Sequence, residues 1–167
     1  MKNAYDYRYD YRSQDQFIDD ILEATKIENY LMSLYVAWLN KNRKSKSLYY
    51  FEDYGVNNSG EFIEDPSKVN CKADFLLKRY NHSNRKIDIK FARKEHSRFH
   101  LKVRQVKKYL KDDVCIINFM GVDTSNIRFC ILKPIELKGW LENAQRCNMW
   151  HQECIRIPCK AVKWNYV

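Results

Sequence analysis

The stretch 86-KIDIKFARK-94 places two charged residues inside an apolar, alternating pattern. In a β-strand, successive side chains point to opposite faces of the sheet. The two isoleucines and Phe91 would then share one face, and Asp88 and Lys90 would share the other. A carboxylate and an ammonium in the middle of such a strand need either solvent or a chemical partner. This strand therefore constrains both how the chain folds and where a functional site could lie.

The periodicity of the remaining sequence predicts a mixed α/β (α+β) fold. Apolar residues recur at three- and four-residue steps over 16–40 and 103–111, which is typical of amphipathic helices. Strands are predicted at 48–53, 69–78, 114–120 and 127–133, a third helix at 134–145 with Pro at its start, and an extended tail at 155–164. The resulting α-β-β-β-α-β order predicts an antiparallel meander of three strands, then a helix and a further strand. Helices would flank this mixed central sheet.

The chain is most simply one domain of 167 residues. Only 4 Gly and 3 Pro, with 45% hydrophobic residues, indicate a packed globule rather than a linker-rich protein. We expect a core over about 17–133, with 134–167 as a C-terminal addition packed on it. Residues 1–15, which include the alternating stretch 5-YDYRYDYR-12, would form an N-terminal arm that rests on the fold or stacks on bases.

The balance of charge favours a polyanionic partner. The chain has 30 Lys and Arg against 21 Asp and Glu, a formal net charge of +9, and nucleic acid is the usual partner of such a domain. The alternative is a basic surface that only keeps the protein soluble. The basic residues are spread through the chain rather than gathered on one amphipathic helix, so no membrane partner is expected.

The sequence contains neither a long apolar run nor a signal-peptide core at its polar start, MKNAYDYRYD. We therefore expect an intracellular, cytoplasmic protein whose 6 cysteines are reduced. Cys147, His151, Cys154 and Cys159 have the spacing C-x3-H-x2-C-x4-C, which could close a zinc site. Because the spacing is irregular and lacks a paired C-x2-C, we interpret these cysteines as core or surface residues.

A second acid, Asp74, lies on the strand predicted before Asp88. Side chains on one face of neighbouring strands approach within about 5 Å, so Asp74, Asp88 and Lys90 could converge at one edge of the sheet. Two such carboxylates repel each other unless a cation neutralises them, and oxygen ligands of this kind suit Mg²⁺, or Mn²⁺ in its place. The backbone carbonyl of Ile89 could add a ligand. Lys90 could help to hold and deprotonate the attacking water, and could neutralise charge on a pentavalent phosphate.

This arrangement of Asp74 and 88-DIK-90 resembles the PD-(D/E)XK nuclease superfamily, and within it most of all the Holliday-junction resolvases and related phage or restriction-type endonucleases. The resemblance covers about residues 17–120. It implies a restriction-endonuclease-like core and hydrolysis of phosphodiester bonds in DNA. The proline that names the family is not beside Asp74, since the nearest is Pro66, and the second acid is Asp rather than the commoner Glu.

The same resemblance implies two further site residues. The family has a glutamate in the first helix, and Glu28, at the edge of the predicted apolar face, matches it as a catalytic residue and metal ligand. Glu23 is the reserve. The family also has a Gln or Lys in the helix after the D/E-x-K strand, and Gln105 matches this position. A second D/E-x-K sequence, 136-ELK-138, lies on a predicted helix and lacks a preceding strand aspartate.

The loop and helix start next to the proposed site carry a set of basic residues that would suit contacts with the phosphates of a duplex. The predicted nucleic-acid-binding residues are Arg93, Lys94, Arg98, His100, Lys102 and Arg104. The alternative is a solvated loop without a partner.

Three functions are compatible with these patterns. The first is an Mg²⁺-dependent DNA endonuclease, expected to act as a homodimer because cutting both strands needs two sites. The second is a non-catalytic nucleic-acid-binding domain, either with a degenerate nuclease fold or as an unrelated basic α/β module. The third is a protein-interaction domain with incidental positive charge. In the structural alternative to a nuclease site, Asp88 and Lys90 form an exposed ion pair on a half-solvated sheet face, which contributes little to stability.

Overall fold

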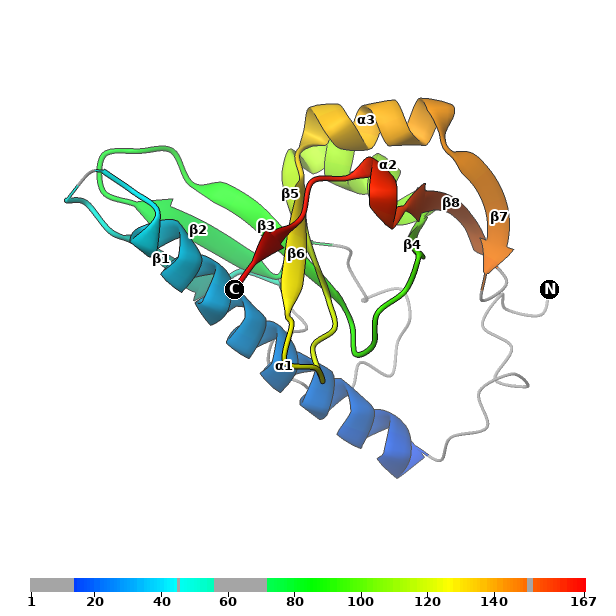
Figure 1. Ribbon diagram of the computed structural model, residues 1–167, viewed down its shortest axis with the longest axis horizontal. Helices are drawn as coiled ribbons and strands as arrows, with labels where there is room; N and C mark the ends of the chain where they lie inside the picture. The colour runs from blue at the N-terminus through cyan, green and yellow to red at the C-terminus, as the bar shows by residue number, and fades with distance from the viewer. Residues whose placement is uncertain (1–13, 45, 56–71, 150–151) are drawn as a thin grey trace.

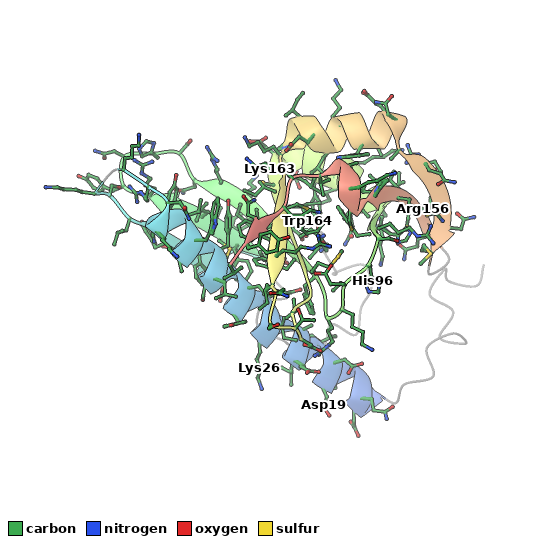
Figure 2. The ribbon with its side chains drawn as sticks, viewed as in Figure 1. Asp19, Lys26, His96, Arg156, Lys163 and Trp164 are labelled. Atoms are coloured by element: carbon green, nitrogen blue, oxygen red, sulfur yellow. The ribbon has the colours of Figure 1, made fainter. Side chains whose placement is uncertain are left out.

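The structure is a computed structural model that describes residues 14–44, 46–55, 72–149 and 152–167 (Figure 1). The chain begins with α1 (Gln14–Lys41), a helix of 28 residues. Asp19 and Lys26, both exposed, project from its outer side (Figure 2). None of the described helices is long and apolar enough to cross a membrane.

A six-stranded mixed sheet lies against α1. Its strands, in spatial order, are β1 (Tyr49–Asp53), β2 (Phe75–Arg79), β3 (Arg85–Ala92), β5 (Val114–Met120), β6 (Arg128–Leu132) and β9 (Asn165–Tyr166). Strands β1, β2 and β3 form the antiparallel meander predicted from the sequence, and β3 then pairs in parallel with β5. This parallel pairing requires a crossover connection, which contains β4 (Arg98–Lys102) and α2 (Val103–Asp112).

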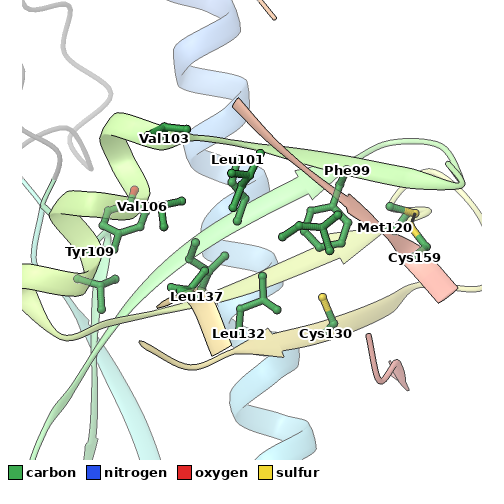
Figure 3. Close-up of a cluster of buried hydrophobic side chains, with 14 of the residues drawn as sticks. Phe99, Leu101, Val103, Val106, Tyr109, Met120, Cys130, Leu132, Leu137 and Cys159 are labelled. Atoms are coloured by element: carbon green, nitrogen blue, oxygen red, sulfur yellow. Dashed lines mark hydrogen bonds between the residues drawn. The ribbon is translucent and has the colours of Figure 1, made fainter. Parts of the chain in front are cut away.

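The two faces of this sheet are covered by different elements. On one face, α1 packs Leu31, Met32 and Tyr35 onto inward side chains of the strands such as Phe75 and Ile89. On the other face, α2 and α3 (Pro134–Asn143) pack onto β5 and β6 (Figure 3). Strands β3 and β5 are therefore covered from both sides, and β5 is buried along nearly its whole length.

A second sheet of three strands lies beside α2 and α3. It consists of β4, β8 (Gln152–Pro158) and β7 (Gln145–Met149), in that spatial order, and a short 3-10 turn (Cys159–Ala161) follows. Phe99 and Leu101 of β4 pair with Ile157 and Ile155 of β8, and all four side chains belong to the core under α2. The C-terminal segment is thus joined to the rest of the fold through β4.

The mixed class of helices and strands predicted from the sequence is confirmed, and most predicted elements lie within a few residues of their observed ends. Three predictions were wrong. The strand predicted over 69–78 begins at Phe75, so Asp74 precedes it, and residues 69–71 lie outside the described part. The segment predicted as a basic loop contains β4, and Gln145, predicted to end the third helix, instead begins β7.

The sequence pattern missed β4 because its pairing partner is distant in the chain, and it missed β7 because the composition of that strand is atypical. The partner of β4 is β8, more than fifty residues later in the chain. Strand β7, QRCNM, has a weakly apolar composition and is held by its pairing with β8 rather than by its own pattern. Of the predicted N-terminal arm over 1–15, residues 1–13 lie outside the described part, and 14–15 belong to α1.

Candidate active site

Asp88, in the middle of β3, is buried beneath α2, and Lys90 beside it is partly buried. Asp88 is only 1% exposed. The Nζ atom of Lys90 lies 2.7 Å from Oδ2 of Asp88, and the Lys90 side chain is 32% exposed. The alternative of an exposed ion pair is therefore wrong for Asp88. A carboxylate withdrawn from water in this way is costly unless it is paired and hydrogen-bonded.

The hydrogen bond that completes this pairing comes from Tyr109 on α2. Its hydroxyl donates to Oδ1 of Asp88 at 2.5 Å, and Tyr109 is only 2% exposed. The ammonium of Lys90 lies 6.0 Å from the centre of the Tyr109 ring. Burial raises the pKa of Tyr109 and the negative charge of Asp88 raises it further, although Lys90 opposes both effects. The hydroxyl therefore keeps its proton and acts as a donor.

Asp74 lies beside Asp88, as the sequence predicts. Its Oδ2 accepts a hydrogen bond from the backbone N–H of Ile89 at 3.0 Å. Phe75 pairs with Ile87 in the β2–β3 ladder, so one further step of the same register places Asp74 opposite Asp88. Burial and the negative charge of Asp88 raise the pKa of Asp74 to about 8, against the opposing effects of Lys90 and the Ile89 amide.

The contact of Ile89 with the site is made through its N–H group. That the Ile89 carbonyl serves as a metal ligand stays a prediction. Asp88 thus lies within β3 and Asp74 directly before β2, and each carboxylate accepts a hydrogen bond from a donor of its own.

Glu28 reaches this group from α1. It is half-buried, and burial raises its pKa to about 7. Lys90 lowers and Asp88 raises the same pKa, so the carboxyl group lies within electrostatic range of both residues. The reserve candidate, Glu23, is instead exposed and lies 2.8 Å from Arg93. Of the two glutamates, Glu28 is the one whose charge acts on the pair in β3.

Lys90 carries the positive charge of the site. Burial alone would lower its pKa, but the negative charge of Asp88, with smaller effects of Tyr109 and Asp74, raises it overall. The side chain is therefore an ammonium at neutral pH and donates hydrogen bonds. A positive charge beside a water favours loss of its proton, because it stabilises the hydroxide that remains. The predicted roles of Lys90, in holding and deprotonating the water and in neutralising phosphate, stay predictions.

The oxygen donors at this place suit a hard divalent cation in their chemistry. The raised pKa values of Asp74 and Glu28 show that Lys90 alone does not offset the burial of these carboxyl groups. In the described parts of the chain, however, no three His, Cys, Asp or Glu side chains stand in positions to hold a metal ion. Oδ1 of Asp88 accepts from Tyr109, whereas the buried Oδ2 lies in an ion pair with Lys90 and has no hydrogen-bond partner among the described residues, so Oδ2 keeps a lone pair for a cation.

Two amide side chains lie near the group. Gln105, predicted from the sequence, is half-buried on α2 and four residues before Tyr109, which places both on the same face of the helix. Asn118 was not predicted. It is 5% exposed on β5, in register with Lys90, and its Nδ2 has no hydrogen-bond partner among the described residues.

The sequence did contain signals for the residues that were missed. Asn118 is the one polar residue inside 114-VCIINFM-120, a strand that is otherwise apolar. Tyr109 lies within the apolar repeat over 103–111, and its hydroxyl, which needs a partner when buried, was the signal that it could contact a polar group. Asn118 and Tyr109 both lie on the same side of the sheet as Asp88.

The predicted nucleic-acid-binding residues are divided between two places. Arg93 belongs to a surface ion-pair group, with nitrogens 2.8 Å from Glu23 and 3.4 Å from Asp123. Lys94 and Arg104 are exposed. The remaining three lie on β4.

On β4, Arg98, His100 and Lys102 alternate with the buried Phe99 and Leu101 and therefore share the outer face of the second sheet. Arg156, labelled in Figure 2, lies on β8 and is in register with His100. Burial, followed by the charges of Arg156 and Arg98, lowers the pKa of His100. This face thus carries a row of cations that is separate from Asp88 and the residues around it.

The described cysteines are free thiols. Cys147 and Cys154 face each other across the β7–β8 ladder, whereas the Cys159 thiol donates to the backbone oxygen of His96 at 3.1 Å. His151, the remaining residue of the zinc alternative, lies outside the described residues. The second D/E-x-K sequence is structural, because Glu136 accepts a hydrogen bond from the Lys133 N–H at the start of α3.

Comparison with known proteins finds no matching family model, no matching curated protein and no matching solved structure.

Proposed function

We propose that this protein is a metal-dependent DNA endonuclease of the PD-(D/E)XK type. The observation that supports the proposal most is the burial of Asp88 in the central strand, with Lys90 at 2.7 Å and Asp74 on the adjacent backbone amide. Two acids and a lysine brought to one point, on a basic chain, are the groups that phosphodiester hydrolysis needs.

Each residue has a proposed role. Asp74 and Asp88 bind an Mg²⁺ ion, which Mn²⁺ can replace, and Glu28 completes or orients its ligands. When bound, the ion supplies Lewis-acid activation of water and of the scissile phosphate. Lys90 donates hydrogen bonds to the attacking water and to the phosphate, whose negative charge increases as the water attacks. Gln105 steadies the water or the phosphate from α2.

The substrate is proposed to be double-stranded or branched DNA. The net charge of +9 supports a polyanionic partner, and the cations on the outer face of β4 are suited to phosphate contacts that position the duplex. Cutting both strands would use two copies of the chain, arranged as a symmetric homodimer.

A second function is favoured by one specific observation. Tyr109 donates to one carboxylate oxygen of Asp88 and Lys90 forms an ion pair with the other, as they would in a core where the acid has a structural role. A non-catalytic nucleic-acid-binding domain with a degenerate nuclease fold would keep this network and bind DNA without cutting it.

A nicking assay on supercoiled plasmid distinguishes the two functions. The native chain is incubated with Mg²⁺, with Mn²⁺, or with EDTA, beside Asp88→Asn and a control, Asp19→Asn, which removes an exposed carboxylate from α1. An endonuclease cuts only with the divalent ions. Asp88→Asn should lower the rate at least ~100-fold, while Asp19→Asn leaves it unchanged.

DNA binding is measured on the same proteins by fluorescence anisotropy in EDTA. Asp88→Asn should bind as well as the native chain or more tightly, because it removes a negative charge near phosphate. Retained binding without metal-dependent cutting, in the native chain, would assign the non-catalytic function. A chain that neither cuts nor binds would exclude both.

A further inference from the structure

A cavity of about 270 Å³ lies at the end of the sheet that is next to the C-terminus of α1. The polar side chains that line it are Tyr49, Lys78, Arg79, His82, Ser83 and Arg85. None of its lining residues is acidic. Arg85 and Asp88 lie three residues apart on β3, and alternation places their side chains on opposite faces of the sheet. The cavity and the candidate active site therefore share no residue.

The strand register explains why the cations gather here. Arg79 of β2 pairs with Tyr49 of β1, and Leu77, two residues earlier, pairs with Arg85 of β3. Because directly paired residues of antiparallel strands share a face, both arginines lie on the α1 face of the sheet. Lys78 is partly neutralised by Glu52 at 2.5 Å, but Glu52 does not line the cavity.

The wall of the cavity is held in place by the end of α1. The side chain of Asn40 donates to the Tyr49 carbonyl at 3.0 Å and accepts from the Tyr49 N–H at 2.8 Å. The guanidinium groups of Arg43 and Arg79 lie over the Tyr49 ring, at 5.1 Å and 5.4 Å from its centre. Figure 1 shows the C-terminal end of α1 beside β1 and β2. Tyr49 thus orders two arginines before any ligand binds.

Two guanidinium groups line the cavity, those of Arg79 and Arg85, whereas Arg43 does not. Guanidinium groups match the geometry of phosphate oxygens, to which they donate two hydrogen bonds at once.

We propose that this cavity is a binding site for a phosphate monoester, separate from the candidate active site and independent of the proposed nuclease activity. Arg85 and Arg79 bind the phosphate oxygens, and the His82 and Ser83 side chains, at the β2–β3 turn, close over them. The volume is below the roughly 300–1,000 Å³ of pockets that enclose drug-sized ligands, so the cavity fits a phosphate with its attached sugar. Such a group occurs on free nucleotides and on the 5′ end of a nucleic acid strand.

Isothermal titration calorimetry on the full chain, in EDTA and low salt, tests the proposal with inorganic phosphate and with AMP. The native chain should bind one equivalent of each. Arg85→Ala removes an exposed side chain of the cavity and should weaken both affinities ~10-fold or more. The control, Lys138→Ala, removes an exposed positive charge from α3 and should leave them unchanged.

A second titration, with a 5′-phosphorylated oligonucleotide and its 5′-hydroxyl counterpart, identifies the source of the phosphate. A strand end requires tighter binding of the phosphorylated form that Arg85→Ala abolishes. Equal binding of both forms, with AMP binding retained, assigns the site to free nucleotides. Asp88→Asn should bind phosphate normally, so failure of the nuclease proposal leaves this result intact.

Two results would overturn the proposal. One is the absence of saturable phosphate and AMP binding by the native chain. The other is unchanged affinity in Arg85→Ala. If that variant also melts at a lower temperature, the cations serve instead to offset the negative end of the α1 dipole.

Discussion

The two faces of the six-stranded sheet contrast in what they bury. The α1 face is apolar and contains several aromatic rings, with Phe129 in contact with both Tyr35 and Phe119. The α2 face contains a comparable apolar core, but Asp88 and Asn118 are buried within the same face of the sheet. The α1 face has the composition that stability alone would favour. The polar groups of the α2 face weaken a purely apolar core and point to a different purpose.

Strand β3 shows this contrast at the scale of single residues. Ile87 and Ile89 are buried against α1, while Lys86, Asp88 and Lys90, on the other face, lie along α2. Lys86 donates to the Asp112 carbonyl at the end of α2 at 2.9 Å. Side chains on one face of β3 thus belong to the core against α1, and those on the other face make polar contacts with α2. Residues that stabilise the fold and residues of the candidate site therefore alternate along this strand.

The largest effect is expected from the α1 face. Phe129→Ala removes a fully buried ring that contacts Trp38 at a centroid distance of 5.1 Å and Tyr35 at 5.6 Å. We expect a loss of about 3–5 kcal/mol in the free energy of unfolding, because the cavity cannot refill. Urea denaturation followed by circular dichroism measures it. Cutting per folded molecule should be preserved, and a loss below about 1 kcal/mol would contradict the stated packing.

The α2 side should instead respond to pH. The pKa of Asp74 is raised to about 8 in the folded state, so the folded protein holds this proton more tightly than the unfolded chain does. Stability is then highest below the ordinary carboxyl pKa and falls as pH rises through about 8. Without divalent ions, the melting temperature should drop on the order of 5 °C between pH 5 and pH 8.

Asp74→Asn isolates the cause of this pH dependence. The variant should lose most of the decrease, and the remainder reflects Glu28, whose pKa is raised in the same direction. Asp19→Asn, which changes an exposed residue, should melt like the native chain at every pH. A melting temperature that rises from pH 5 to pH 8 in EDTA would contradict the predicted direction of this pH dependence.

A smaller effect is expected from the hydroxyl of Tyr109. Tyr109→Phe keeps the ring in the core but removes the donor to Asp88, which should cost about 1–3 kcal/mol in the free energy of unfolding. The same change frees Oδ1 of Asp88, so Mn²⁺ should raise the melting temperature of the variant more than that of the native chain. If Mn²⁺ shifts neither protein, Asp88 is not a metal ligand.

Local periodicity was sufficient to predict much of this fold. The alternation of β3 and the three- and four-residue repeat of α1 are properties of short segments, and the sequence predicted both elements to within a few residues. The adjacency of Asp74 and Asp88 followed from a hairpin between consecutive strands. Predictions of this kind succeed because the contacts involved are close in sequence.

The burial of the candidate site and the strands of the second sheet depended on contacts between distant segments. Asp88 is buried because α2 returns over β3, and a strand pattern alone cannot reveal which helix will cover it. Strand β4 exists through its pairing with β8, and the position of Asn118 beside Lys90 follows from the parallel register of β3 and β5. The polar partners of the site come from these non-local contacts.

The smallest effect is expected where charge lies outside both faces. Glu23→Gln breaks an exposed ion pair with Arg93, which also contacts Asp123, and should change the free energy of unfolding by less than about 0.5 kcal/mol.

Glu28→Gln, one and a half turns along the same helix, removes instead a carboxyl group whose pKa depends on Lys90 and Asp88. It should slow metal-dependent cutting at least ~10-fold and also weaken the melting-temperature shift caused by Mn²⁺. Parallel melts and nicking assays compare the two variants. Equal behaviour of Glu23→Gln and Glu28→Gln would remove Glu28 from the site, because only burial beside β3 distinguishes the two carboxylates.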